Sequence, residues 1–368
     1  MVGEEDRKDK MIEKRDSNLE LFRIIAIILI TFNHIASLGR ATGSSLPFNH
    51  YLALFYYMWG KIGVNGFVIL GCWFLADRPV RTSQIIRICL EVFFYGTVLN
   101  LLYIIIFHER FSLFSICRGY FYWYVFAYII MLLLIPFMKK AAWSENKYVL
   151  SALFVLLSVI PTVSRTGMYL PGFLRRIYGL FNSETILGPF WFSFLFLLTR
   201  KFKNNKVLDK CSSRLAGGIA VLCVMIMFAL TIIMNDTYIR DMYSVPCLAA
   251  SFGLFVIFEK RKTGYYAWIN YLASFSFALY LFQAHNGSKT HLWQDVLHME
   301  KWSGQVWFPL YSVGAVFLIF LLCAVPELLR QRLHKTETVQ NLEKKLGKVL
   351  EKILPVLRIG QTGQKDNI

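Results

Sequence analysis

Long apolar segments alternate with short polar connections along most of this chain. Most of the segments are about 20 residues long, which lets a helix cross about 30 Å of hydrocarbon. Backbone groups in lipid must be satisfied within the segment, so the segments are predicted to be helices rather than strands. Ten spans are expected, at about residues 18–38, 50–75, 84–107, 120–138, 147–163, 186–200, 215–234, 242–258, 268–285 and 306–326.

The last part of the chain has a different pattern. Between about residues 332 and 358, apolar side chains recur at helical spacing with Lys and Glu between them. These apolar residues are Val339, Leu342, Leu346, Val349, Leu350, Ile353 and Leu357. The pattern predicts an amphipathic helix on the inner membrane surface. A short coiled coil or a solvated tail is the alternative.

The expected fold is therefore all-α: a polytopic membrane protein with about ten transmembrane helices and a C-terminal amphipathic helix. Three parts are predicted, a cytoplasmic tail (residues 1–17), a transmembrane domain (18–326) and a cytoplasmic amphipathic tail (327–368). The first apolar run is not followed by a small-residue cleavage site, so we expect a retained helix rather than a signal peptide.

The composition agrees with a membrane protein. Hydrophobic residues make up 56% of the chain and charged residues only 17%, with a net charge of +17. In a soluble protein this charge would suggest nucleic-acid binding. Here the basic residues fall between the apolar segments, which is typical of positive-inside topology. Membrane lipid is therefore the expected partner, and nucleic acid is not.

The basic residues also predict the orientation. If the N-terminus is cytoplasmic, the loops with Arg78, Lys140, Lys203 and Arg261 are inside, and the loop with Lys289 is outside. The inner loops then carry more Lys and Arg than the outer loops, as the positive-inside rule requires. Ten spans return the C-terminus to the cytoplasm, so we expect a multi-pass protein of the cell membrane with both termini inside.

Cysteine usage limits the chemistry. The seven cysteines lie mostly in apolar segments and form no CxxC pair. Neither a zinc site nor a disulfide framework is predicted, and no metal is expected.

The first predicted span carries two ionisable residues, Arg23 and His34. Such residues are costly in lipid and usually face the interior of a bundle. Eleven residues bring both side chains within about 20° of one helix face and about 16 Å apart along the axis. One face thus offers a fixed cation near the cytoplasm and a titratable base near the outside. In the alternative, Arg23 reaches the inner interface and His34 is a satisfied polar residue near the outer one.

Several sequence motifs occur along this chain in the same order as in a known protein family. Asn18-Leu-Glu-Leu-Phe-Arg23 followed by Asn33-His34 resembles the first helix of the acyltransferase-3 family of membrane acyltransferases. Gly63-Val-Asn-Gly-Phe-Val-Ile-Leu-Gly-Cys72-Trp-Phe resembles its Gly-rich second helix, although Cys72 stands where Ser is usual. Arg78-x-x-Arg81, the Phe121–Tyr128 run before Pro136, and Ser274–His285 resemble later motifs in the same order. The resemblance covers about residues 18–326.

The resemblance implies transfer of an acyl group, with acyl-CoA as the donor and acetyl-CoA as the first candidate. His34 would remove a hydroxyl proton or carry the acyl group. Arg23, Arg78, Arg81 and Arg87 would hold the donor, because arginine pairs well with phosphates. Ordinary positive-inside charge is the alternative for Arg78 and Arg81. Arg87 stands four residues before Glu91, a spacing that also fits a purely structural ion pair.

Other candidates rest on position. His285 closes the ninth span near the predicted depth of His34, so the two could share a cavity; a wet interfacial histidine is the alternative. Trp123 is a substrate-binding candidate or part of an aromatic belt. Glu184 and Trp191 flank Gly188-Pro189 and are expected to shape an acceptor pocket.

The expected function is a membrane O-acyltransferase that modifies a hydroxyl of a cell-surface polysaccharide or lipid-linked sugar. A glycolipid transporter or flippase is the second hypothesis, and a catalytically inactive membrane partner is the third. Transporters often contain internal repeats, and none is found in the sequence. Whether the chain forms a homo-oligomer is left open.

Overall fold

The computed structural model describes residues 17–108, 117, 119–141, 146–159, 184–234, 238–261 and 264–355. All regular elements in these ranges are helices, so the all-α prediction is confirmed. The longer helices are α2 (Ser17–Ser37), α3 (Pro47–Asp77), α4 (Thr82–Phe107), α6 (Trp123–Lys140), α10 (Glu184–Asn204), α11 (Ser213–Met234), α12 (Val245–Glu259), α17 (Phe308–His334) and α18 (Glu337–Ile353). The shorter helices are α7 (Lys147–Phe154), α13 (Ala267–Ala273), α14 (Ser276–Ala284), α15 (Asn286–Thr290) and α16 (Met299–Ser303), with π-helical turns η3 (Val155–Val159) and η6 (His291–Val296).

In the described ranges, six helices are long and apolar enough to cross a membrane: α2, α3, α4, α6, α11 and α17. Of predicted span 147–163, the structure describes residues 147–159, which form α7 and η3; residues 160–163 lie outside the described residues. Predicted spans 186–200 and 242–258 correspond to α10 and α12, which are less apolar or shorter than the six. The long apolar helices and the shorter ones between them are those of an all-α polytopic membrane protein, as predicted.

The ninth predicted span, 268–285, is not one helix. It is broken at Ser274 and Phe275 into α13 and α14. The Ser274 and Phe275 N–H groups bond to carbonyls only three residues earlier, so the backbone tightens there and the helix axis changes. The end of α14 is thereby placed among α2, α4 and α17, inside the bundle.

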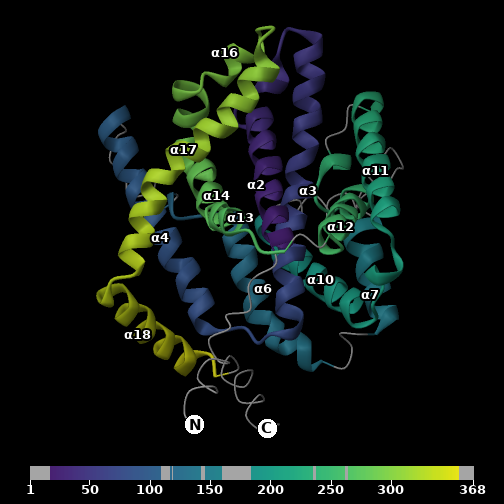
Figure 1. The fold of residues 1–368 in the computed structure, drawn as a ribbon, viewed down its shortest axis with the longest axis vertical. Helices are drawn as coiled ribbons and strands as arrows, with labels where there is room; N and C mark the ends of the chain where they lie inside the picture. The colour runs from purple at the N-terminus through teal and green to yellow at the C-terminus, as the bar shows by residue number, and fades with distance from the viewer. Residues whose placement is uncertain are drawn as a thin grey trace, which may run out of the picture.

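Helices α2 and α3 pack together at the centre of the bundle (Figure 1). Three glycines of α3, each three residues apart, lie against α2. A Cβ at Gly63 would lie 2.6 Å from the Ala26 carbonyl oxygen, and one at Gly66 would lie 2.9 Å from the Phe22 ring. Small residues of this kind let membrane helices approach closely. These contacts fix α2, the helix that carries Arg23 and His34, against α3.

The other helices flank this pair. Helices α4, α17 and α18 lie on one side, and α7, α10, α11 and α12 lie on the other (Figure 1). In α3, 67% of the most apolar window is buried, compared with 17% in α11. Helix α3 is therefore central, whereas α11 exposes most of its apolar surface, as expected for a helix in contact with lipid.

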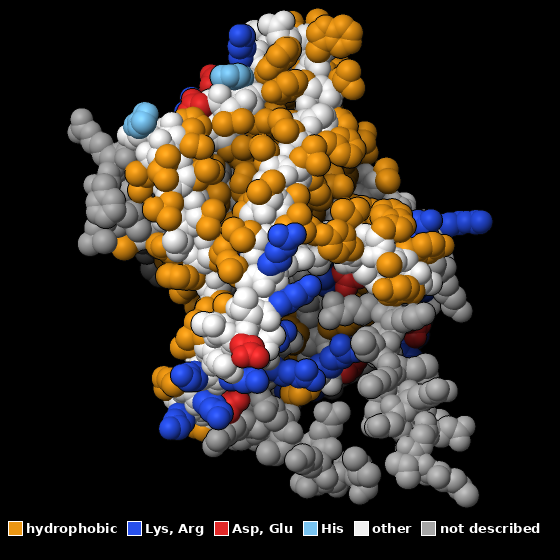
Figure 2. All heavy atoms as spheres, turned by 60° about the vertical axis from the view of Figure 1, so that its left-hand side comes forward, with side chains coloured by type: hydrophobic (Ala, Val, Ile, Leu, Met, Phe, Trp, Pro, Cys, Tyr) orange, Lys and Arg blue, Asp and Glu red, His pale blue; other side chains and the backbone are white. Residues whose placement is uncertain are grey.

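Basic side chains gather at one end of the molecule. Figure 2 shows the face with α4, α17 and α18, where hydrophobic side chains cover the upper part and Lys and Arg lie below them. This separation is the one that a membrane protein with a basic inner border presents. We refer to the lower part as the basic end.

The C-terminal helix is confirmed as α18, and it is strongly amphipathic. Leu342, Leu346, Val349 and Ile353 are exposed, whereas Glu343 and Gly347 are buried. The helix thus turns its acidic side towards the protein and leaves an apolar ridge free, the arrangement expected at a membrane surface. The predicted domain boundary at residue 326 falls inside α17, because that helix accommodates Pro326 and continues to His334.

Candidate active site

His34 occupies the last turn of α2. Its ring meets the ring of Trp293 in η6 edge-on, with 6.0 Å between centroids. The Nδ1 atom is buried and makes no hydrogen bond within the described part of the chain. The side chain as a whole remains partly exposed. An imidazole in this position can be reached by a ligand and still has hydrogen-bonding capacity to offer it.

Gln283 of α14 lies beside His34. Its side chain is fully buried, and neither of its amide atoms has a hydrogen-bond partner in the described residues. Its backbone carbonyl accepts a 3.2 Å hydrogen bond from Trp293 Nε1. Trp293 therefore packs on the ring of His34 and also donates a hydrogen bond to the backbone of Gln283. Sequence reasoning missed Gln283, because an uncharged amide in an apolar segment gives no signal of its own.

Lys61 was also missed, although the sequence carried a signal for it. It is a lysine within the apolar run of α3, and charges in such runs usually face a bundle interior. Its Nζ atom lies 5.3 Å from the centroid of the Trp123 ring, within the range of a cation–π interaction. Lys61 and the more exposed Lys289 are both close enough to act electrostatically on His34. The structure thus joins Trp123, a predicted site residue, to the surroundings of His34.

His285 lies at the end of α14 but faces α4 rather than α2. Its ring stacks on Tyr103 with 5.7 Å between centroids, and its Nδ1 accepts a 3.1 Å hydrogen bond from the Gly287 N–H. It is only 2% exposed, so it is not a wet interfacial histidine. The ring contacts of the described residues do not join His285 to His34. His285 caps α15 through Nδ1, and its Nε2 is buried without a hydrogen-bond partner in the described residues.

Arg23 lies on the same unbroken helix as His34, nearer its start. Its Nη1 is 2.8 Å from the carboxylate of Glu20. Its charge also acts on the hydroxyl groups of Tyr124 and Tyr128 in α6. Arg23 therefore faces the tyrosine-lined interior between α2 and α6, and the predicted face with a cation below and a histidine above is present.

Arg78 and Arg81 are exposed in the connection between α3 and α4, at the basic end. Two lysines from other helices join them there. Lys139 of α6 donates a 2.8 Å hydrogen bond to the Arg78 carbonyl, and Lys203 of α10 forms an ion pair with Asp77. The ends of α3, α6 and α10 thus bring together a cluster of cations that we call the basic cluster: Arg78, Arg81, Lys139 and Lys203.

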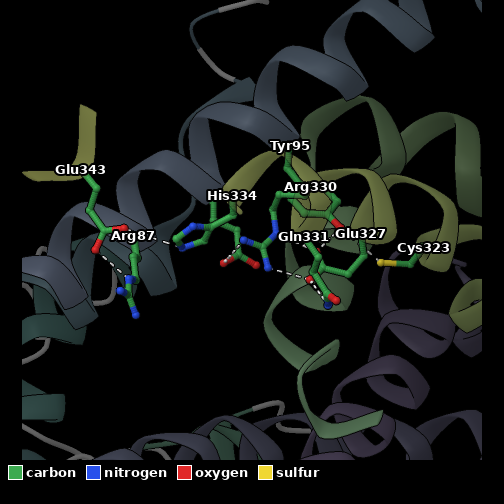
Figure 3. Close-up of polar contacts among 9 residues, drawn as sticks. Arg87, Tyr95, Cys323, Glu327, Arg330, Gln331, His334 and Glu343 are labelled. Carbon is green, nitrogen blue, oxygen red and sulfur yellow. Dashed lines mark hydrogen bonds and ion pairs between the residues drawn. The ribbon is translucent and has the colours of Figure 1, made fainter. Parts of the chain in front are cut away.

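The predicted ion pair between Arg87 and Glu91 is wrong, because each residue has a partner on another helix. Arg87 Nε donates a 2.8 Å hydrogen bond to Glu343 of α18, and Glu91 lies 3.5 Å from Arg330 of α17. Figure 3 shows Arg87 and Glu343 at one end of a row of charged side chains. Arg87, a predicted donor-binding residue, therefore ties α18 to α4 in this structure.

The same row contains a buried acid. Glu327 of α17 is 0% exposed, and Arg330 donates to both of its oxygens at 2.7 and 2.8 Å. Tyr95 of α4 and Gln331 also donate to Glu327, at 3.0 and 2.9 Å (Figure 3). The charge is fully paired and hydrogen-bonded, which is the condition for a stable buried carboxylate. This group fastens α17 to α4 rather than forming an open site.

Trp191 and Glu184 are the two remaining predicted site residues. Trp191 of α10 is fully buried, and its only N–H donates a 2.9 Å hydrogen bond to Asn65 of α3. These contacts give it a packing role and leave no donor for a sugar. Glu184 is the first residue of α10, and its side chain lies outside the described residues.

The arrangement contains the groups that proton transfer requires. The described residues contain no group of three or more His, Cys, Asp or Glu side chains that could hold a metal ion. They do contain a histidine with an unpaired nitrogen, an adjacent unpaired amide, and cations near it and at the basic end. A base, a hydrogen-bond donor and cations for an anionic ligand are thus present on neighbouring helices.

A comparison with protein families agrees with this geometry. A family model described as "Acyltransferase domain" matches residues 16–325. No curated protein and no solved structure matches the chain.

Proposed function

Because this chain belongs to the acyltransferase-3 family of membrane acyltransferases, we propose that it moves an acyl group from cytoplasmic acyl-CoA to a hydroxyl on the outer side of the membrane. Acetyl-CoA is the proposed donor. The proposed acceptor is a cell-surface polysaccharide or its lipid-linked precursor, and the enzyme is then an O-acetyltransferase of the cell membrane.

His34 carries this proposal. It is a partly exposed histidine with an unpaired nitrogen, inside a bundle of otherwise apolar helices. In the proposed reaction, the acceptor oxygen attacks the thioester carbonyl carbon while the imidazole takes the hydroxyl proton. The carbon–sulfur bond then breaks, and the leaving thiolate receives that proton from the imidazolium. The acyl group ends on the acceptor, and free CoA is released.

The donor is proposed to enter at the basic end. Arg78, Arg81, Lys139 and Lys203 are suited to the phosphates of CoA, because charge-assisted hydrogen bonds to phosphate are strong. Arg23 lies between this cluster and His34, among tyrosines that can line the path of the pantetheine arm. A long donor could thus keep its charged end in the cytoplasm while its thioester reaches His34.

One observation favours a second candidate, a glycolipid transporter or flippase. The break between α13 and α14 is a discontinuous helix within the bundle, and discontinuous helices are common at transporter binding sites. A transporter needs no acyl donor and leaves the acyl thioester intact. The two functions therefore differ in their chemistry and can be separated by it.

The test uses the full-length protein purified and reconstituted in lipid vesicles with acetyl-CoA. We expect release of free CoA by the wild type and a decrease of about 10²–10⁴-fold in His34→Ala, the usual contribution of a general base. His50→Ala is the matched control, because its ring contacts the Thr42 carbonyl away from the site. Near-wild-type CoA release by His34→Ala would exclude His34 from the mechanism, and no release by the wild type would favour the transporter.

A second measurement addresses the acceptor. Mass spectrometry of surface glycans from cells with and without the gene should show acetyl groups that depend on the gene. Identical glycans in the two strains, with CoA release still present in vitro, would exclude a surface glycan as the acceptor.

A further inference from the structure

Gln283 is a buried amide that makes no side-chain hydrogen bond in the described residues. It is 0% exposed, and its Oε1 and Nε2 atoms both lack hydrogen bonds in the described residues. Burying an unpaired amide is unfavourable, and native proteins contain few such groups. A group of this kind therefore points to a ligand that is bound during function.

The position of the amide is fixed by its neighbours. The Gln283 carbonyl is held by Trp293 Nε1 at 3.2 Å, and Trp293 is itself fully buried against the His34 ring. Helix α14 packs against α2, α4 and α17, so it cannot shift without disturbing three other helices. The amide is thus held next to His34 by its backbone, while its side-chain atoms remain available.

The two unpaired groups are chemically complementary. His34 Nδ1 is buried without a partner, as are the two amide atoms of Gln283 beside it. An amide oxygen can accept a proton shared from Nδ1–H, which leaves Nε2 as the basic nitrogen. The amide NH₂ group can then donate to a carbonyl oxygen.

We propose that Gln283 bridges His34 and the acyl carbonyl, an inference that rests on the proposed function. Its Oε1 accepts from His34 Nδ1–H, and its NH₂ group donates to the carbonyl oxygen of the acyl thioester. As the acceptor oxygen attacks, negative charge develops on that carbonyl oxygen and is stabilised by the amide N–H. The acceptor proton passes to His34 Nε2, the carbon–sulfur bond breaks, and the thiolate leaves with that proton.

The test compares Gln283→Met with Gln294→Met in the reconstituted full-length protein. Methionine keeps the length of the side chain but removes both polar atoms. We expect Gln283→Met to lower kcat about 10²–10³-fold, the effect of removing one oxyanion donor, with little change in KM for acetyl-CoA. Its Tm should stay the same or increase, because no existing hydrogen bond is lost.

Gln294 is the matched control because its Nε2 does make a hydrogen bond, of 2.9 Å, to the Leu38 carbonyl near the same end of α2. Gln294→Met should therefore lower Tm and keep most of kcat. Gln283→Asn is the second variant. It keeps the amide group, but the side chain is one methylene shorter, so the amide lies farther from His34. We expect it to fold like the wild type and to lose activity as Gln283→Met does.

Two outcomes would overturn the inference. If Gln283→Met and Gln283→Asn keep wild-type kcat while His34→Ala is inactive, Gln283 takes no part in the reaction and the proposed function still stands. If both Gln283 variants lower Tm as much as Gln294→Met does, the amide has a structural role. Wild-type CoA release by His34→Ala, by contrast, would overturn the proposed function itself.

Discussion

Arg23, Arg78 and Arg81 carry the same charge but occupy different surroundings. Arg78 and Arg81 are exposed at the basic end. Arg23 has 27% of its side chain exposed, is paired with Glu20, and faces the tyrosines of α6. If all three contact the donor, the first two meet its phosphates and the third meets a part closer to the thioester. Their contributions to binding and to catalysis should therefore differ.

Arg78→Ala and Arg81→Ala are expected to raise KM for acetyl-CoA with a smaller effect on kcat. Phosphates bind equally in the ground state and the transition state, and such uniform binding affects KM. Arg23→Ala should lower kcat as well. The measurement is a donor titration at several salt concentrations, because salt screens the remaining charges.

Arg332→Ala is the control for these variants, because Arg332 is an exposed arginine of α17 outside the basic cluster. It should leave both constants unchanged. If Arg78→Ala and Arg81→Ala keep the wild-type KM for acetyl-CoA, these arginines do not bind the donor and only determine the orientation of the protein in the membrane.

The sequence could predict ionisable residues more readily than neutral ones. Arg23 and His34 stood out because charge in an apolar run is costly, and the structure keeps them on one helix. Lys61 carried the same signal and would have been found by applying that rule to the second span. Gln283 could not have been found, because its significance is the absence of a partner, which only packing reveals. The hydrogen bond from Trp191 to Asn65 could not be predicted for the same reason, since Asn65 lies 126 residues away in the chain.

Helices α17 and α18 are each joined to α4 by charged groups, and these groups differ in burial. Glu327 is completely buried against Arg330 and Tyr95. Glu343 is also largely buried, but its partner Arg87 has 58% of its side chain exposed. When the partner carboxylate is removed, an arginine that reaches water is solvated instead, so little stability is lost. A buried arginine is left neither solvated nor paired, which is strongly destabilising.

Glu327→Ala should therefore lower the free energy of unfolding by about 3–5 kcal/mol, the usual effect of breaking a buried ion pair. Glu343→Ala should cost at most about 1 kcal/mol, as expected for a partly exposed pair. Unfolding in detergent, followed by circular dichroism, measures both. Equal losses in the two variants would show that Glu91 supports Arg330 well enough to replace Glu327.

At the level of helices, apolar patterning was a good guide to where helices lie and a poor guide to where they end. The pattern placed a helix in every predicted span. It could not show the break at Ser274 and Phe275, because both halves are equally apolar. The predicted last span ended at about residue 326, whereas α17 continues to His334, and the carboxylate of Glu327 within it accepts a hydrogen bond from Tyr95 of α4.

The distribution of charge over the whole molecule predicts its orientation. The basic cluster lies at one end, and Lys289 belongs to the short helix α15 that follows α14. A positive inner border places the basic cluster in the cytoplasm and α15 outside. With this orientation we expect both termini in the cytoplasm.

Cysteine labelling measures this orientation. In a variant without the seven native cysteines, of which Cys89 and Cys117 are exposed, Lys203→Cys and Lys289→Cys are introduced one at a time. In intact cells, an impermeant maleimide should label position 289 and not position 203. Permeabilised cells, in which both should react, are the control. Labelling of 203 alone in intact cells would reverse the orientation and remove the basis for a cytoplasmic donor site.

The pairing of α4 with α17 has a consequence for biosynthesis. Tyr95 and Glu327 are 232 residues apart in the chain, and translation adds about 5–20 residues per second. Helix α4 therefore leaves the ribosome roughly 10–50 s before its partner, at that rate of translation. During this interval Glu91 lacks Arg330 and Arg87 lacks Glu343, the partners that each has in the finished fold. The newly made half of the protein must be held by the insertion machinery, or sit shallowly in the membrane, until α17 arrives and locks the bundle.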